Sequence, residues 1–183
     1  MQSTQRRALS IGLLLLGLVW IAFSADRGGA STNGLVPAPR AGFLAPDFTL
    51  QTLDGETVSL ASLRGQAVLV NIWASWCAPC RAEMPAMQRV YEEYKDQGLV
   101  VLAVNSTVQD TAASAKAFIA EFGLTFPILL DVDGAATGLY QVHALPSSFF
   151  IGRDGIIVEV VIGGPMSETL LRTRVEKILE TQP

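Results

Sequence analysis

Cys77 and Cys80 are the only cysteines in this sequence, and two residues separate them. They follow an apolar run, Ala67–Ala74, and they precede a segment whose apolar residues recur with helical spacing. A Cys-x-x-Cys pair at the point where a strand turns into a helix is typical of a centre that alternates between dithiol and disulfide. We therefore predict redox chemistry at these two sulfurs.

The start of a helix near Cys77 gives the two sulfurs different roles. The unpaired backbone N–H groups and the positive end of the helix dipole favour a thiolate at Cys77. Because the thiolate is the species that attacks a disulfide, we expect Cys77 to be the nucleophile. Cys80 lies one turn further along the same face, where it can resolve a mixed disulfide. Pro79 suits the first helical turn, in which a backbone N–H is not needed.

Three other interpretations of the pair stay open at this point. The cysteines could form a static structural disulfide, although a disulfide within the first turn of a helix would not connect distant segments of the chain. They could supply half of a zinc site, but the chain has no further cysteine and only one histidine, His143. They could bind copper(I), with His143 or a methionine as a further ligand. We favour the redox interpretation and predict neither a metal nor another cofactor.

An uncharged apolar run near the start of the chain predicts a membrane-spanning segment. As a helix, residues 8–25 would span roughly 27 Å, which is close to the ~30 Å hydrocarbon core of a bilayer. Arg6 and Arg7 precede the run, so the positive-inside bias predicts a cytoplasmic N-terminus and an exported remainder. Small-x-small sites at 22–24 and 28–30 leave cleavage open, and we favour a retained anchor. The expected location is the cell membrane, with the catalytic domain extracytoplasmic.

Composition divides the chain into three parts. We expect a membrane anchor or signal segment over 1–25, a flexible linker rich in Gly, Ala, Pro, Ser and Thr over 26–40, and one folded domain over 41–183. From Arg40 onward there are 10 basic and 16 acidic residues, a net charge of −6. This balance argues against binding to nucleic acid. Export would also place both cysteines where an oxidised pair can persist.

Within the folded domain, hydrophobic periodicity predicts strands that alternate with helices. The expected strands are 48–51, 57–60, 68–74, 99–104, 127–130, 148–151 and 156–162, and the expected helices are 77–97, 112–122, 135–140 and, after Ser167 as N-cap, a helix to about 180. This order predicts an α/β fold, a three-layer sandwich around a central mixed β-sheet, preceded by the N-terminal transmembrane helix.

Three motifs together resemble the thioredoxin superfamily, and within it the membrane-tethered extracytoplasmic branch typified by TlpA, ResA and CcmG. The motifs are Trp76–Pro85, Leu145–Phe150 and the turn Asp154-Gly155. The likeness covers residues 41–180, so it implies a thioredoxin-like fold for nearly all of the expected domain.

The resemblance also implies roles for single residues. Cys77 is the exposed nucleophile and Cys80 the buried resolving thiol of a redox-active disulfide. Pro146 matches the family's cis-proline, which packs against that disulfide. The backbone of Leu145 would pair with an extended substrate chain as an added strand. Trp76, Leu145 and Pro146 are therefore the expected substrate-binding residues.

Two positions depart from cytosolic thioredoxin. Asn71 stands where thioredoxin has a buried aspartate that helps to move protons at the resolving cysteine. Glu83 lies three residues after Cys80, as in the ResA-like proteins. From there its carboxylate could accept the proton of the Cys80 thiol, so we predict that Glu83 tunes the pair; the alternative is a solvated glutamate on the helix surface. His143, three residues before Pro146, is either at the rim of the active site or an ordinary loop residue.

The resemblance implies a disulfide reductase that keeps exported thiols reduced. The expected clients are apocytochrome c cysteines, in cytochrome c biogenesis, or copper-site cysteines of oxidase assembly. The electrons would come from a membrane partner of the CcdA or DsbD type, which a tethered domain can reach. One alternative is a disulfide-forming oxidant of the DsbA type, which Glu83 and the missing helical insert disfavour. A peroxiredoxin with antioxidant activity is disfavoured because Ala74 replaces its threonine, and an SCO-like copper chaperone because its cysteines are spaced differently.

Overall fold

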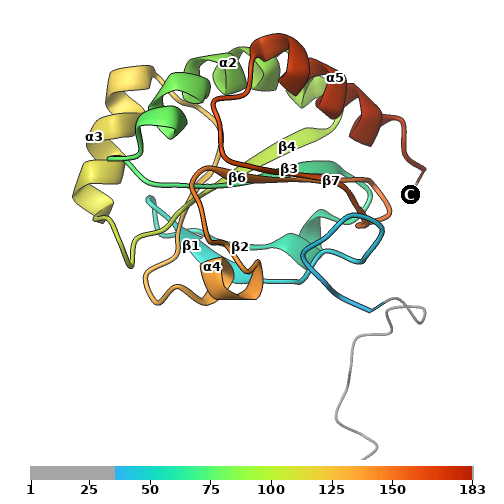
Figure 1. The fold of residues 1–183 in the computed structure, drawn as a ribbon, viewed down its shortest axis with the longest axis horizontal. Helices are drawn as coiled ribbons and strands as arrows, with labels where there is room; N and C mark the ends of the chain where they lie inside the picture. Colours follow the sequence, from blue (N-terminus) through green and yellow to red (C-terminus); the bar gives the residue numbers. More distant parts are fainter. Residues whose placement is uncertain (1–35, 183) are drawn as a thin grey trace, which may run out of the picture. The chain divides into compact units, whose positions relative to one another are not determined.

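The fold is built on a mixed β-sheet, described by a computed structural model for residues 36–182. Within these residues the sheet has seven strands in the order β2-β1-β5-β4-β3-β6-β7 (Figure 1). The strands are β1 (Thr49–Thr52), β2 (Thr57–Ser59), β3 (Ala67–Trp73), β4 (Leu99–Asn105), β5 (Ile128–Leu130), β6 (Ser147–Ile151) and β7 (Ile157–Ile162). β3 runs parallel to β4 and antiparallel to β6, which makes the sheet mixed.

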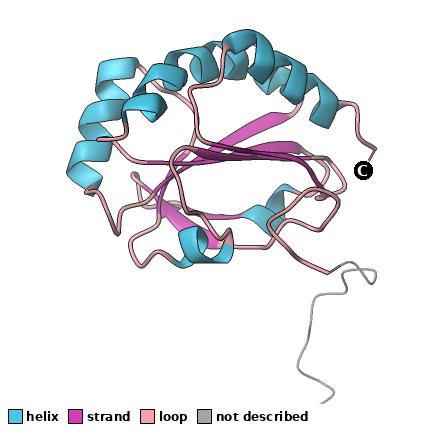
Figure 2. Cartoon of the chain, viewed as in Figure 1, coloured by secondary structure: helices cyan, strands magenta, loops and turns pink. Residues whose placement is uncertain are grey.

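Helices cover both faces of the sheet (Figures 1 and 2). On one face lie α2 (Ala78–Tyr94), α3 (Ala112–Phe122) and α5 (Glu168–Leu179). The other face carries α4 (Ala135–Leu139) and a short 3-10 helix, η1 (Leu60–Leu63). The predicted three-layer α/β sandwich around a central mixed sheet is confirmed.

Strand β3 is the central support of the active site, and all of its residues are buried. Leu69 and Trp73 pack into the core beneath α2 and α5, whereas Val70 and Ile72 belong to the core on the opposite face. Burial of each such side chain contributes about 1.5–3 kcal/mol relative to exposure. The segment 74–77 connects the carboxyl end of β3 to the start of α2, and the buried strand therefore holds it in a fixed position.

The long helix begins where the sequence predicts and ends one turn earlier. α2 stops at Tyr94, and a 3-10 helix, η2 (Lys95–Gln97), follows it. Gly98 closes this turn in the left-handed conformation, with φ 93°, and donates its N–H to the Lys95 carbonyl. Tighter bonds of this kind satisfy carbonyl groups that a helix end leaves unpaired. Pro85 lies inside α2, and the helix continues through it.

The predicted membrane-spanning run, residues 8–25, lies outside the described residues, as does the linker up to residue 35. From 36 to 182, no helix is long and apolar enough to cross a bilayer. Pro37 and Ala38, at the end of the predicted linker, already associate with the domain: the Ala38 N–H donates to the Leu44 carbonyl at 3.0 Å. Leu44 in turn bridges to Ile156, next to the start of β7.

Candidate active site

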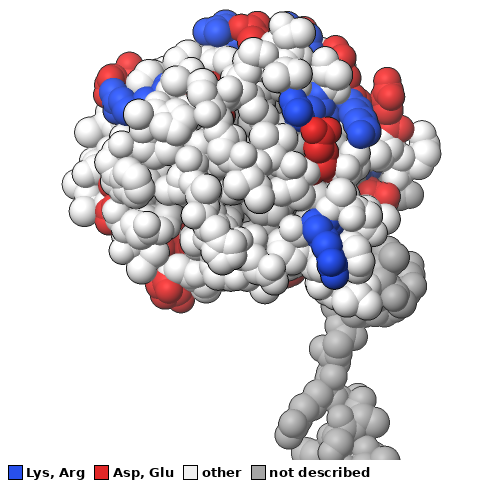
Figure 3. All heavy atoms as spheres, viewed as in Figure 1, with Lys and Arg blue, Asp and Glu red and all other residues white. Residues whose placement is uncertain are grey.

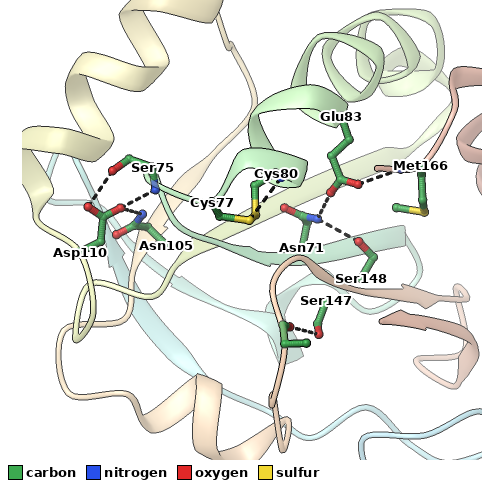
Figure 4. Close-up of a disulfide and its surroundings, with 11 residues drawn as sticks. Asn71, Ser75, Cys77, Cys80, Glu83, Asn105, Asp110, Ser147, Ser148 and Met166 are labelled. Atoms are coloured by element: carbon green, nitrogen blue, oxygen red, sulfur yellow. Dashed lines mark hydrogen bonds between the residues drawn. A yellow bond between two sulfur atoms is a disulfide. The ribbon is translucent and has the colours of Figure 1, made fainter. Parts of the chain in front are cut away.

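The two cysteines form a disulfide at the first turn of α2 (Figure 4). Cys77 is the N-cap residue, and its sulfur accepts the backbone N–H of Cys80 at 3.3 Å. Pro79 occupies the first turn, where it costs no hydrogen bond. The N-terminus of α2 thus points at the Cys77 sulfur, an arrangement that stabilises negative charge on that atom.

The two sulfurs differ in access. Cys77 is 4% exposed and Cys80 is fully buried. Cys77 also lines a groove of about 510 Å³, which Cys80 does not. A disulfide in another protein therefore meets Cys77 first, although the exposed area of Cys77 in the oxidised protein is small.

The groove beside Cys77 lies between residues 74–77, which form the active-site loop, and the segment before β6. Its walls include Trp76, Pro79, Gln109, Val142, His143 and Leu145. The structure therefore places His143, which is exposed, at the rim of the groove. Leu145 is half-buried, and its peptide bond to the buried Pro146 is cis, as the resemblance implied.

A glycine loop closes over the cis-proline. The Gly163 N–H donates to the Pro146 carbonyl at 2.7 Å. A Cβ atom at Gly164 would lie 2.9 Å from Pro146 Cγ and 2.8 Å from Glu83 Oε2. Only a residue without a side chain fits this gap, so the sequence pattern Gly-Gly-Pro after β7 has a role in the site that sequence analysis missed.

Three exposed apolar side chains lie on or near the loops that form the groove, and Trp76 among them lines it. Trp76 is 59% exposed, and its indole N–H donates to the Gln109 carbonyl at 2.9 Å. The neighbouring Val108 is 54% exposed and donates its N–H to the Asp131 carbonyl, next to the 66% exposed Val132. We call Trp76, Val108 and Val132 the apolar ridge. An exposed apolar surface beside a reactive centre is typical of a protein-interaction site.

Glu83 is fully buried rather than solvated on the helix surface. Its Oε1 accepts a hydrogen bond from Asn71 Nδ2 at 3.0 Å, and its Oε2 accepts the Met166 N–H at 3.1 Å (Figure 4). Burial raises the pKa of this carboxyl, and the hydrogen bonds from Met166 and Asn71 offset part of that rise. A buried carboxyl one helical turn from Cys80 can accept a proton at a higher pH than a solvated one.

Asn71 connects Glu83 to the sheet. Its Nδ2 donates a second hydrogen bond to Ser148 Oγ on β6 at 2.9 Å. Of the buried side-chain polar atoms that the structure describes, only Asn71 Oδ1 and Trp73 Nε1 have no hydrogen-bond partner. The sequence singled out Asn71 as a departure from thioredoxin but did not predict these contacts.

A second carboxylate, Asp110, holds the active-site loop and was missed by sequence analysis. It accepts hydrogen bonds from Ser75, Asn105 and Thr111. Burial by itself would raise the pKa of Asp110, but these hydrogen bonds together hold that pKa below its ordinary value. The feature of the sequence that could have identified Asp110 is its position as an acidic residue shortly after β4, the strand that runs parallel to β3.

The zinc and copper(I) interpretations of the cysteine pair both require further ligand side chains near the two sulfurs. Over residues 36–182, no group of three or more His, Cys, Asp and Glu side chains gathers as a metal site would. The two cysteines are instead joined to each other.

A disulfide at a helix N-terminus, next to a cis-proline and a buried carboxyl, defines a thioredoxin-like thiol-disulfide oxidoreductase. Comparison with known proteins identifies the family within this class to which the chain belongs. Residues 41–160 match the AhpC/TSA family. The chain is 39% identical over 126 residues to the thiol-disulfide oxidoreductase ResA of Bacillus thuringiensis (strain Al Hakam), covering 69% of this chain and 72% of that relative.

A second relative extends the match to almost the full length. ResA of Geobacillus kaustophilus (strain HTA426) is 34% identical over 181 residues, which cover 99% of this chain and 98% of that relative. The chain therefore belongs to the AhpC/TSA family and, within it, to the ResA-type thiol-disulfide oxidoreductases.

Solved structures show the same fold. StoA from Bacillus subtilis superposes with a TM-score of 0.62 at 31% identity, covering 70% of this chain and 96% of that one. A thiol:disulfide interchange protein of the thioredoxin family from Chlorobium tepidum TLS gives a TM-score of 0.64 at 30% identity, covering 79% and 99%. The thioredoxin-like fold and the resemblance identified from three motifs are confirmed.

Proposed function

We propose that this protein is a membrane-tethered, extracytoplasmic reductase of disulfides in client proteins. The observation that carries the proposal is the buried carboxyl of Glu83 one helical turn from Cys80. A reductase must deprotonate its resolving thiol to complete each exchange, and Glu83 provides a base for that proton.

The exchange proceeds in two steps. In the reduced protein, the Cys77 thiolate attacks one sulfur of the client disulfide; that bond breaks, and the departing client thiolate takes up a proton. Cys80 then loses its proton to the Glu83 carboxylate and attacks Cys77 Sγ. The second client thiolate leaves and is protonated. Two electrons pass from the protein to the client, and the protein is left with the Cys77–Cys80 disulfide seen in the structure.

The role of Glu83 can be tested by substitution. In Glu83→Gln we expect slower exchange and a changed pH dependence, because the amide cannot accept a proton. Glu56→Gln, an exposed glutamate, is the matched control. Rates of Glu83→Gln that equal the wild-type rates between about pH 6 and 9 would contradict this role.

The groove and the apolar ridge support a protein as the substrate. The backbone of Leu145, at the groove wall, can pair with an extended client strand, while Trp76 contacts its side chains. In Figure 3 the middle of the viewed face carries few charged side chains, and charges gather along the edge where α2 and α5 lie. Apocytochrome c cysteines and copper-site cysteines are the client classes that we propose.

The membrane tether is supported by the sequence of residues 8–25 and by the linker that follows it. An electron donor of the CcdA or DsbD type would restore the dithiol after each exchange. Labelling of Cys77 with a membrane-impermeant thiol reagent tests the location. We expect labelling in intact cells after mild reduction, and labelling only after lysis would overturn it.

The direction of electron flow depends on the reduction potential of the Cys77–Cys80 couple. A value at or below about −220 mV, in the range of thioredoxin and the glutaredoxins, would support a reductase. A value near the roughly −120 mV of DsbA would overturn the proposal and make the protein an oxidant.

A peroxiredoxin is the second candidate, since a cysteine at a helix N-terminus is also where a peroxide-reactive thiolate forms. Ala74 lacks the hydroxyl that such a site would use. Hydrogen peroxide consumption by Cys80→Ser, in which Cys77 acts alone, would favour this candidate, and its absence would exclude it.

A further inference from the structure

A buried carboxamide oxygen beside the active site has no partner in the oxidised protein. Asn71 is fully buried, and both of its amide hydrogen bonds come from Nδ2, to Glu83 and to Ser148. Among the described residues, none donates a hydrogen bond to Asn71 Oδ1. A buried acceptor without a donor is destabilising, so this position favours any state of the protein that supplies a donor.

The chemistry of the partners fixes which way the amide points. The Glu83 carboxylate that acts as proton acceptor in the proposed function is ionised and can only accept hydrogen bonds, so in that state the nitrogen of Asn71 faces Glu83 and the oxygen faces away from it. Alternate side chains of a strand share a face, and Asn71 therefore shares that of Leu69 and Trp73, which pack in one core with Cys80. Figure 4 shows Asn71 between the disulfide and Glu83, with its oxygen on the side of the sulfurs.

Reduction creates the missing donor. When the disulfide opens, Cys80 gains an S–H group, and this group is on the side of the amide that lacks a partner. We propose that Asn71 is a positioning residue for the resolving step: its Oδ1 accepts a hydrogen bond from the Cys80 thiol while its Nδ2 holds Glu83. One amide then aligns the proton donor with the proton acceptor, and the inference rests on the proposed role of Glu83.

In the step itself, the S–H bond of Cys80 breaks and its proton passes to the Glu83 carboxylate. The electron pair stays on sulfur, which forms the bond to Cys77 Sγ and releases the client thiolate. Asn71 neither gains nor loses a proton.

The pH dependence of the step comes from few groups. Ser148 on β6 and the Met166 N–H, which follows β7, are uncharged partners of the network. The titratable groups of the network are therefore Cys77, Cys80 and Glu83, all on α2 or at its N-cap. Two others lie nearby: His143 lines the groove beside Cys77, and the Asp110 carboxylate holds Ser75.

The direct test is the infrared S–H stretching band of Cys80 in full-length Cys77→Ala, in which Cys80 is the only thiol. With Asn71 present, we expect the lower frequency of a hydrogen-bonded thiol. Asn71→Leu should move the band to the position of an unbonded thiol. Ser148→Ala, which removes the other partner of Nδ2, should leave the band in place. An unbonded band with Asn71 intact overturns the proposal, and this result does not depend on the folding of any variant at position 71.

The rates of the initial attack and of the resolving step are a second measurement, and they distinguish the role of Asn71 from the role of Glu83. We expect Asn71→Leu to slow resolution of the mixed disulfide about tenfold, with the initial attack by Cys77 changed less than twofold. A normal resolution rate in folded Asn71→Leu contradicts the proposal. If Glu83→Gln leaves the rates and their pH profile unchanged while the S–H band still shifts in Asn71→Leu, the proton-acceptor role of Glu83 fails and the Asn71–Cys80 contact stands.

Discussion

Asp110 holds Ser75 by two hydrogen bonds, accepting its N–H at 2.6 Å and its hydroxyl at 2.8 Å. The same carboxylate accepts Asn105 Nδ2 at 2.9 Å and the Thr111 N–H at 2.8 Å. Ser75 directly precedes the segment Trp76-Cys77, so one side chain from the loop after β4 fixes the loop that presents the nucleophile.

Replacing Asp110 by asparagine should destabilise the protein by about 1–3 kcal/mol at pH 7, because one amide oxygen cannot accept four donors. The pKa of Asp110 is lowered in the folded state, so its contribution is present above the ordinary value of 3.8 and is lost as the pH falls through the folded pKa. Urea unfolding at neutral and acidic pH measures this. Asp96→Asn, at an exposed position, is the control. If Asp110→Asn lowered the unfolding free energy equally at neutral and acidic pH, the prediction would be contradicted.

Gly164→Ala should lower stability by about 1–3 kcal/mol and slow exchange, since the added methyl group meets Glu83 and Pro146 at once. Gly138→Ala is the matched control, because a Cβ atom there has nothing within 4 Å and helical alanine is favoured. Thermal unfolding and exchange rates check both variants. If Gly164→Ala behaves like Gly138→Ala, the close packing around Glu83 is refuted.

The raised pKa of Glu83 predicts an unusual stability profile. For a carboxyl whose folded pKa exceeds the unfolded value, the stabilisation is fully present below the unfolded value of 4.5 and is lost as the pH rises through the folded pKa. Glu83→Gln imitates the protonated form and should therefore gain stability relative to wild type as the pH rises from about 4.5 to 8. If the difference in unfolding free energy between Glu83→Gln and wild type stayed constant across this pH range, that result would contradict a buried ionised carboxylate at Glu83.

Trp76→Ala should raise KM for a protein disulfide about tenfold and leave the reduction of a small disulfide such as cystine nearly unchanged, because the indole contributes contact area and not chemistry. Trp76→Phe keeps the aromatic surface but loses the hydrogen bond to Gln109, and should behave like wild type. Equal effects of Trp76→Ala on both substrates would show that the residue acts on Cys77 instead.

Local chemistry made several features predictable from the sequence. The unbroken apolar run predicts the buried strand β3, and Ser167 caps α5 as expected, accepting the Leu170 N–H at 3.3 Å. Cys77 at the start of α2 follows from its neighbours Pro79 and Cys80. In each case a few adjacent residues determine the outcome.

The buried network depends on contacts that no local pattern contains. Asn71 and Ser148 are 77 residues apart in the chain, and Glu83 and Met166 are 83 apart. Helical spacing places Glu83 on the same side of α2 as Cys80, but only tertiary packing decides whether that side is buried. Asp110 was missed for the same reason, because an acidic residue in a loop is ordinarily solvated.

Trapping of the mixed disulfide shows which cysteine attacks the disulfide of a client protein. Reduced Cys80→Ser and Cys77→Ser are each mixed with a purified protein that contains one disulfide, and adducts are mapped by mass spectrometry. We expect a stable adduct through Cys77 in Cys80→Ser, which lacks the resolving thiol, and almost none in Cys77→Ser. An adduct through Cys80 that forms as readily as the one through Cys77 would contradict this expectation.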